Sequence, residues 1–266
     1  MLKKETSQTI YKLIGTVVEK YLAKAELKPK KTSGNPFVIA VFKDFEPLLH
    51  RIHGAKGAFG HVMEKIAEVI AKDRWGKNNV RKGAKIDIEL PRNVFQAIDS
   101  IINDLSNSSK HPSYKQEKNL VLKACRNTSK RKERHTYAID MELYDRSKNR
   151  YYYLEMKGPD PNTTEVPGAK RKLMTEMAWA YYNMKRKKVD CIFGLYYNNK
   201  HPEPYRNPKV LYYFDPEGSQ GLKVQETFWN FIGKSNTTFS EILEIFKRYG
   251  KNNKKRIFSG FSKLVK

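Results

Sequence analysis

Glu155 and Lys157 stand two residues apart near the end of the segment Tyr151–Lys157, which Gly158-Pro159 closes. The segment is rich in aromatic residues and alternates as a β-strand does, so both side chains fall on one face. Burying a carboxylate or an ammonium is costly unless the charge is paired. The pair therefore either lies at the surface or is retained for chemistry.

Asp140 belongs to the preceding segment, His135–Tyr144, which also alternates as a strand. The turn Asp145–Asn149 joins the two segments and predicts an antiparallel hairpin. Asp140 and Glu155 could then offer carboxylates to one point. Such hard oxygen donors suit Mg²⁺, with Mn²⁺ as a substitute, and a bound metal lowers the pKa of a water and polarises a phosphate.

Lys157 would lie close to that water and phosphate, where it could orient the nucleophile and stabilise growing negative charge. The bare Glu-x-Lys pattern is weak, because the chain holds a second copy at Glu26-Leu27-Lys28, at a helix end and followed by Pro29. The copy at Glu155 is the stronger candidate for a functional site, because it lies in a predicted hairpin with Asp140 and in a strongly basic chain. A surface hairpin with salt bridges is the alternative.

The charge balance points to a polyanionic partner. The 266 residues include 52 Lys and Arg against 28 Asp and Glu, a formal net charge of +24. This favours nucleic acid first and an anionic membrane surface second. No apolar run approaches the roughly 18 residues of a membrane span, and no signal peptide opens the chain, so the cytoplasm is the expected location.

Cysteine and histidine add no further chemistry. Cys125 and Cys191 cannot make a zinc cluster, suggest no disulfide framework and are expected to be buried free thiols. The six histidines fall in no metal-binding spacing.

Helical periodicity recurs along most of the chain. The helices predicted from it cover residues 6–27, 37–53 after a cap at Asn35-Pro36, 57–75, 93–105, 165–188, 224–232 and 239–249. In the helix 57–75, Glu64 lies at the border of the apolar stripe. It is either a carboxylate at the rim of a cleft or an ordinary surface glutamate.

Strands are predicted mainly in the second half. They cover residues 85–90, 120–124, 135–144, 151–157, 189–197 and 209–214.

The order of hairpin, helix and strand implies a crossover, and hence a mixed sheet. We therefore expect an α/β (α+β) fold: a central mixed sheet flanked by helices. Residues 1–118 form a mainly helical N-terminal part, with one helix packed on the core, and residues 119–266 form the catalytic core with C-terminal helices. The whole is expected to be one compact domain.

The chemistry-bearing residues resemble a known pattern. Asp140, fourteen intervening residues and Glu155-Met156-Lys157 are similar to the PD-(D/E)XK nuclease motif. The surrounding sequence is closer still to type II restriction endonucleases of the TdeIII-like group. That resemblance spans most of residues 35–250 and rests on five segments, 60–67, 139–143, 154–162, 168–173 and 226–229.

The resemblance implies a role for each matching residue. Asp140, Glu155 and the carbonyl of Met156 would be metal ligands, Lys157 the catalytic lysine, and Glu64 an acid acting directly or through water. Two departures matter: Ile139 stands where the motif has Pro, and Glu142 shares the face of Asp140, so it could take that residue's place.

The resemblance also implies a partner and a setting. Such enzymes are homodimers that cut both strands of double-stranded DNA at a short palindromic site, in the cytoplasm of a prokaryotic cell. A cognate DNA methyltransferase is expected in the same system, not as a stable subunit. The group is associated with GGNCC-type sites, a specificity that we do not transfer.

DNA contacts are expected from basic and amide side chains. Candidates for phosphate contact are Lys130, Arg131, Arg134, Lys170 and Arg171; candidates for base readout are Asn198, Asn199, Arg206 and Asn207; Asn162 is a further candidate for DNA binding. For each loop residue, the alternative is an ordinary turn-forming role. Two other functions stay open: a structure-specific nuclease of the same fold in repair or junction resolution, and a non-catalytic basic nucleic-acid-binding protein.

Overall fold

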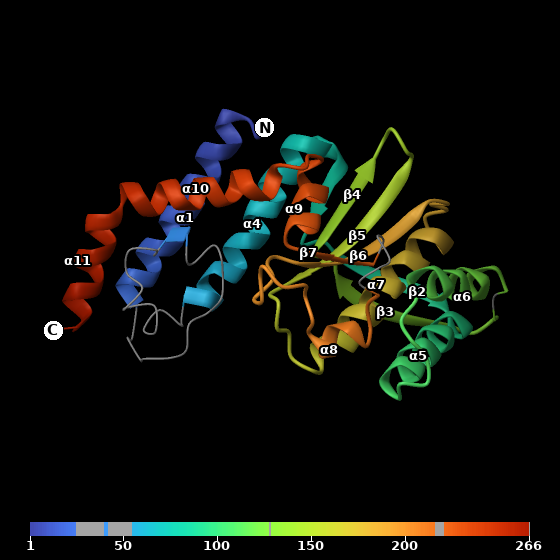
Figure 1. The fold of residues 1–266 in the computed structure, drawn as a ribbon. Helices are drawn as coiled ribbons and strands as arrows, with labels where there is room; N and C mark the ends of the chain where they lie inside the picture. Colours follow the sequence, from blue (N-terminus) through green and yellow to red (C-terminus); the bar gives the residue numbers. More distant parts are fainter. Residues whose placement is uncertain (25–39, 42–54, 128, 216–220, 266) are drawn as a thin grey trace. The chain divides into compact units, whose positions relative to one another are not determined.

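The computed structural model describes residues 1–24, 40–41, 55–127, 129–215 and 221–265 (Figure 1). The chain divides into two compact units. The helical unit comprises Met1–Arg74, Tyr196–Tyr205 and Gln225–Lys266. The sheet unit comprises Trp75–Leu195 and Arg206–Val224.

The helical unit is built on amphipathic helices. Its main helices are α1 (Lys4–Lys24), α4 (Ala55–Trp75), α9 (Glu226–Gly233), α10 (Thr238–Asn252) and α11 (Lys254–Val265). Ile10, Ile14 and Val18 recur at four-residue spacing on α1 and are fully buried. Phe59 of α4 packs against Phe246 of α10, with ring centroids 5.9 Å apart. Apart from residues 40 and 41, the helix predicted over 37–53 lies outside the described residues.

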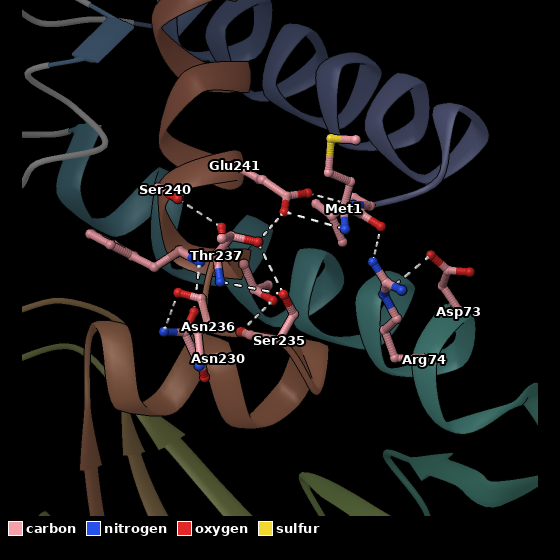
Figure 2. A network of polar contacts seen from close by, with 12 residues as sticks. Met1, Asp73, Arg74, Asn230, Ser235, Asn236, Thr237, Ser240 and Glu241 are labelled. Carbon is pink, nitrogen blue, oxygen red and sulfur yellow. Dashed lines mark hydrogen bonds and ion pairs between the residues drawn. The ribbon is translucent and has the colours of Figure 1, made fainter.

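Polar contacts also join α1, α4 and α10 (Figure 2). The hydroxyl of Thr6 donates to Asp73 Oδ2 at 3.0 Å, and Arg74 donates to the carbonyl of Met1. Glu241 of α10 lies 3.8 Å from the amino group of Met1. These contacts fix the start of α1 against the end of α4 and the first turns of α10.

The sheet unit contains a five-stranded sheet in the order β1-β4-β5-β6-β7. Its strands are β1 (Val80–Lys82), β4 (Met141–Asp145), β5 (Arg150–Lys157), β6 (Val189–Leu195) and β7 (Leu222–Val224). β1, β4 and β5 are antiparallel neighbours, whereas β5, β6 and β7 run parallel. The predicted mixed sheet is therefore confirmed.

Helices complete the sheet unit. They are η2 (Lys77–Asn79), α5 (Arg92–Ser106), α6 (Tyr114–Arg126), α7 (Glu165–Tyr182) and α8 (Pro208–Leu211). α7 is the crossover between β5 and β6 and packs against β6, all seven residues of which are buried. Cys125 and Cys191 are buried free thiols, as predicted. No helix in the described ranges has both the length and the apolar character needed to cross a bilayer.

Two predicted strands are wrong. Leu120–Ala124 lies inside α6, where Val121 and Cys125 are buried one helical turn apart and Leu120 is half exposed. Lys209–Phe214 instead opens as α8. Its start follows a helix rule: Asn207 accepts from the backbone N–H of Lys209 at 3.1 Å, with Pro208 in the first turn.

Two further elements have different bounds. The helix predicted to reach Lys188 ends at Tyr182. The strand predicted over His135–Tyr144 is two strands, β3 (Lys132–Ala138) and β4. β3 pairs with β2 (Lys85–Pro91) in a separate two-stranded sheet, so the chain changes sheets at Ile139 and Asp140.

Candidate active site

Asp140 sits at the point where the chain leaves one sheet and enters the other. The chain also changes sheets between β1 and β2, at Gly83 and Ala84, and backbone hydrogen bonds join these two residues to Ile139. The N–H of Gly83 donates to the carbonyl of Ile139 at 2.9 Å, and the N–H of Ile139 donates to the carbonyl of Ala84 at 2.9 Å. Gly83 has a φ of +67°, a conformation that favours glycine. This bend frees Asp140 from the strand ladder.

Glu155 lies beside Asp140 on the neighbouring strand. Met141 faces Leu154 in the antiparallel pair of β4 and β5, which brings the residue before Met141 level with Glu155. The N–H of Met156 donates to Asp140 Oδ2 at 3.2 Å. The structure thus brings together the two acids that the sequence predicts as partners.

Two lysines complete this cluster. Lys157 Nζ lies 3.3 Å from Glu155 Oε1. Lys172 of α7 reaches both acids: its Nζ lies 2.7 Å from Asp140 Oδ1, and it also pairs with Glu155 Oε2. Each of the four carboxylate oxygens therefore faces a donor from the chain itself. We call Asp140, Glu155, Lys157 and Lys172 the acid–lysine cluster.

Burial and charge oppose each other in the cluster. Burial raises the pKa of Glu155, the charge of Asp140 raises it further, and Lys172 offsets only part of the rise. Burial alone would lower the pKa of Lys172, but the two carboxylates outweigh it and raise that pKa. Lys172 is therefore held as a cation between the acids.

Glu176 stands one helical turn beyond Lys172 on α7 and is fully buried. Neither of its carboxylate oxygens has a hydrogen-bond partner among the described residues. Burial raises its pKa well above the usual range, and nearby Lys172 only partly offsets this. Sequence reasoning missed both residues. The only signal was an acid four positions after a lysine on a helix that covers the sheet.

Glu142 has a different environment from Asp140. It is buried on β4, and its carboxylate accepts from Arg186 at 2.8 Å. Arg186 also contacts the hydroxyl of Tyr153 and lies over the ring of Tyr151, 3.7 Å from its centroid. Glu142 thus belongs to a structural ion pair, and Asp140 is the acid beside Glu155.

Glu64 lies on α4 in the helical unit and is half-buried. Its predicted catalytic role stays a prediction.

Three predicted DNA contacts have structural partners instead. Lys170 is buried and donates to Glu117 and, at 2.7 Å, to the carbonyl of Tyr213; its predicted phosphate contact stays a prediction. Asn198 is buried, and its amide donates to the carbonyl of Glu203 at 2.6 Å. Asn207 caps α8.

The other candidates are more accessible. Lys130, Arg131, Asn162 and Arg206 are exposed, and Asn199 is half-buried. Arg134 is exposed and donates to Glu89 at 3.1 Å, whereas Arg171 pairs with Asp99. Their predicted roles in DNA binding stay predictions.

The donor set of the cluster fits a magnesium ion. Across the described ranges, no three His, Cys, Asp or Glu side chains gather to hold a metal. Mg²⁺ does not need three, because it commonly takes one or two carboxylates and keeps several waters. Asp140 and Glu155 would supply those two carboxylates.

The mixed sheet with flanking helices and an N-terminal helix is consistent with the restriction-endonuclease-like fold. The family model of the type II restriction endonuclease HinfI matches residues 2–250. The chain therefore belongs to the HinfI family of type II restriction endonucleases, which confirms the class indicated by the sequence resemblance.

One curated relative is the type II restriction enzyme MjaII of Methanocaldococcus jannaschii. It is 26% identical to this chain over 230 residues, an alignment that covers 80% of this chain and 58% of the relative. The chain thus spans less than two thirds of that relative's length.

Proposed function

We propose that the chain is a metal-dependent endonuclease that cuts both strands of double-stranded DNA at a short palindromic site. The observation that carries the proposal is the approach of Asp140 and Glu155 at the β4–β5 pair, with Lys157 Nζ 3.3 Å from Glu155 Oε1. Membership of a type II restriction endonuclease family supports DNA cleavage, and the net charge of +24 suits a polyanionic substrate.

The PD-(D/E)XK assignment gives each residue a role. Asp140, Glu155 and the carbonyl of Met156 would hold Mg²⁺, or Mn²⁺ in its place. When bound, the metal would polarise the scissile phosphate and lower the pKa of a bound water. Lys157, whose side chain is one-third exposed, would orient that water and stabilise negative charge on the phosphate. Glu64 remains a candidate additional acid.

The exposed cations beside β3 suit backbone contact. Lys130 and Arg131 are exposed just before the strand that leads to Asp140. Phosphate contacts would position the duplex, whereas base readout would come from other side chains such as Asn199 and Arg206. One active site per chain implies a homodimer for double-strand cleavage. We place the enzyme in a prokaryotic cytoplasm with a cognate methyltransferase.

The test is to incubate the purified chain with mixed plasmid DNA and Mg²⁺ and to sequence the resulting ends. Discrete ends that share one short palindrome would support the proposal and give the site and stagger together. Branched and nicked duplexes should be digested in parallel, because cleavage confined to them would make the protein a structure-specific nuclease. Binding without cleavage at any metal concentration would make it a non-catalytic DNA-binding protein.

A further inference from the structure

Lys172 occupies the place where the two acids converge. Its Nζ contacts Asp140 Oδ1 at 2.7 Å and also pairs with Glu155 Oε2, and its side chain is 16% exposed. The other two oxygens face the N–H of Met156 and the ammonium of Lys157. A divalent cation bound to both acids would therefore meet the ammonium charge of Lys172 on the same oxygens, and like charges at that range repel.

Glu176 offers the ammonium a second partner. Residues four apart on a helix lie on the same side, so Glu176 is within reach of the Lys172 side chain. Glu176 is fully buried, and both of its oxygens lack a hydrogen-bond donor within the described part of the chain. Buried polar atoms are normally paired, so an unpaired carboxylate one helical turn from the Lys172 ammonium requires an explanation.

We propose that Lys172 is the resident counter-ion of Asp140 and Glu155 and that divalent metal displaces it toward Glu176. This inference rests on the proposed metal-dependent function and assigns positioning roles to two residues outside the Glu-x-Lys motif. Lys172 neutralises the acids while the metal is absent. Glu176 lowers the cost of displacing Lys172 by pairing with its ammonium as a carboxylate, and it releases to solvent the proton that it holds while the metal is absent.

The first experiment measures Mn²⁺ binding to the full chain by calorimetry, without DNA. Lys172→Met removes the competing cation, so Mn²⁺ should bind about tenfold more tightly. This magnitude is the smallest change that a neighbouring charge typically makes to the proton affinity of a carboxylate. The metal-free variant should melt at a lower temperature than wild type and regain stability with Mn²⁺. Equal or weaker Mn²⁺ binding by a folded Lys172→Met variant would overturn the proposal.

Lys118→Met is the matched control. Lys118 also bridges a carboxylate and a second acceptor in the sheet unit, since it pairs with Asp190 and donates to the carbonyl of Val189 at 2.6 Å. It is not part of the acid–lysine cluster. Its loss should change the melting temperature without changing Mn²⁺ affinity.

The second experiment places Glu176→Gln in two backgrounds. In the wild-type chain it should weaken Mn²⁺ binding several-fold, because Lys172 loses its alternative ionic partner. Combined with Lys172→Met it should have no effect. A fall in affinity in that double variant would overturn the exchange, because Glu176 would then act as a metal ligand itself.

Glu155→Ala separates failure of this inference from failure of the proposed function. If wild type and Glu155→Ala bind Mn²⁺ equally, or neither binds it, the proposed metal site itself fails. If wild type binds through Glu155 but Lys172→Met binds no more tightly, only the exchange fails.

Discussion

The backbone N–H of Met156 donates to the side chain of Asp140 at 3.2 Å, which ties the start of β4 to the Glu-x-Lys segment of β5. This contact joins residues that are 16 positions apart in the chain. It places Asp140, one predicted metal ligand, against the residue that follows Glu155, another predicted ligand.

Replacing Glu142 should cost stability more than chemistry. Glu142→Ala would leave Arg186 without its buried partner, and breaking such a pair typically costs about 3–5 kcal/mol. Urea unfolding would measure the loss, and Glu142→Gln should recover part of it by keeping a hydrogen-bond acceptor. A folded, stable Glu142→Ala variant that does not cleave DNA would instead make Glu142 the catalytic acid.

Lys170 should matter to folding and not to DNA affinity. It forms a buried pair with Glu117, so Lys170→Met should destabilise the chain by roughly 3 kcal/mol and leave the DNA affinity of folded molecules unchanged. Chemical unfolding and a filter-binding assay would separate the two effects. A large loss of DNA binding at full stability would return Lys170 to the phosphate contacts.

The exposed cations near β3 should contribute to the salt dependence of DNA binding. If Lys130 and Arg131 each contact one phosphate, each alanine variant should lower the slope of log affinity against log salt by about 0.9. Lys148→Ala, on the exposed turn between β4 and β5, is the control and should leave the slope unchanged. An unchanged slope in the first two variants would place the duplex elsewhere.

Glu176 should make metal-free stability fall as pH rises. Its folded-state pKa is raised by burial well above its ordinary value of 4.5, so above pH 4.5 the folded chain holds a proton that the unfolded chain has lost. Stability from this residue is present below that pH and declines as pH rises through the folded-state pKa. Melting temperatures with a chelator should show this decline in wild type and less of it in Glu176→Gln. A difference between the two that does not vary with pH would contradict the protonated state.

The sequence predicted the parts of the site that depend on local pattern. Alternation and a short turn were enough for the hairpin, and therefore for the approach of Asp140 and Glu155. The prediction of secondary structure from the sequence failed where apolar runs are short. Around Leu120 and Lys209, residues typical of strands form helices, because burial at four-residue spacing in α6 and the Asn207 cap of α8 override local propensity.

The sequence could not give contacts that depend on tertiary packing. Lys170, Arg171 and Lys172 form one basic run, yet Lys170 is buried with Glu117, Arg171 pairs with Asp99 and Lys172 reaches the acids. Neighbours on a helix point about 100° apart, so the packing of α7 decides the partner of each. The bend at Asp140 likewise depends on Gly83, more than fifty residues earlier.

We assign the chemistry of DNA cleavage to Glu155 and Lys157. The most direct test of this assignment is plasmid cleavage with Mg²⁺ by wild type, Glu155→Ala and Lys157→Ala, with Lys148→Ala as the control and DNA binding measured in parallel. We expect both site variants to lose roughly a hundredfold or more of the cleavage rate while still binding DNA, and the control to cut like wild type. Undiminished cleavage by either Glu155→Ala or Lys157→Ala would contradict the assignment.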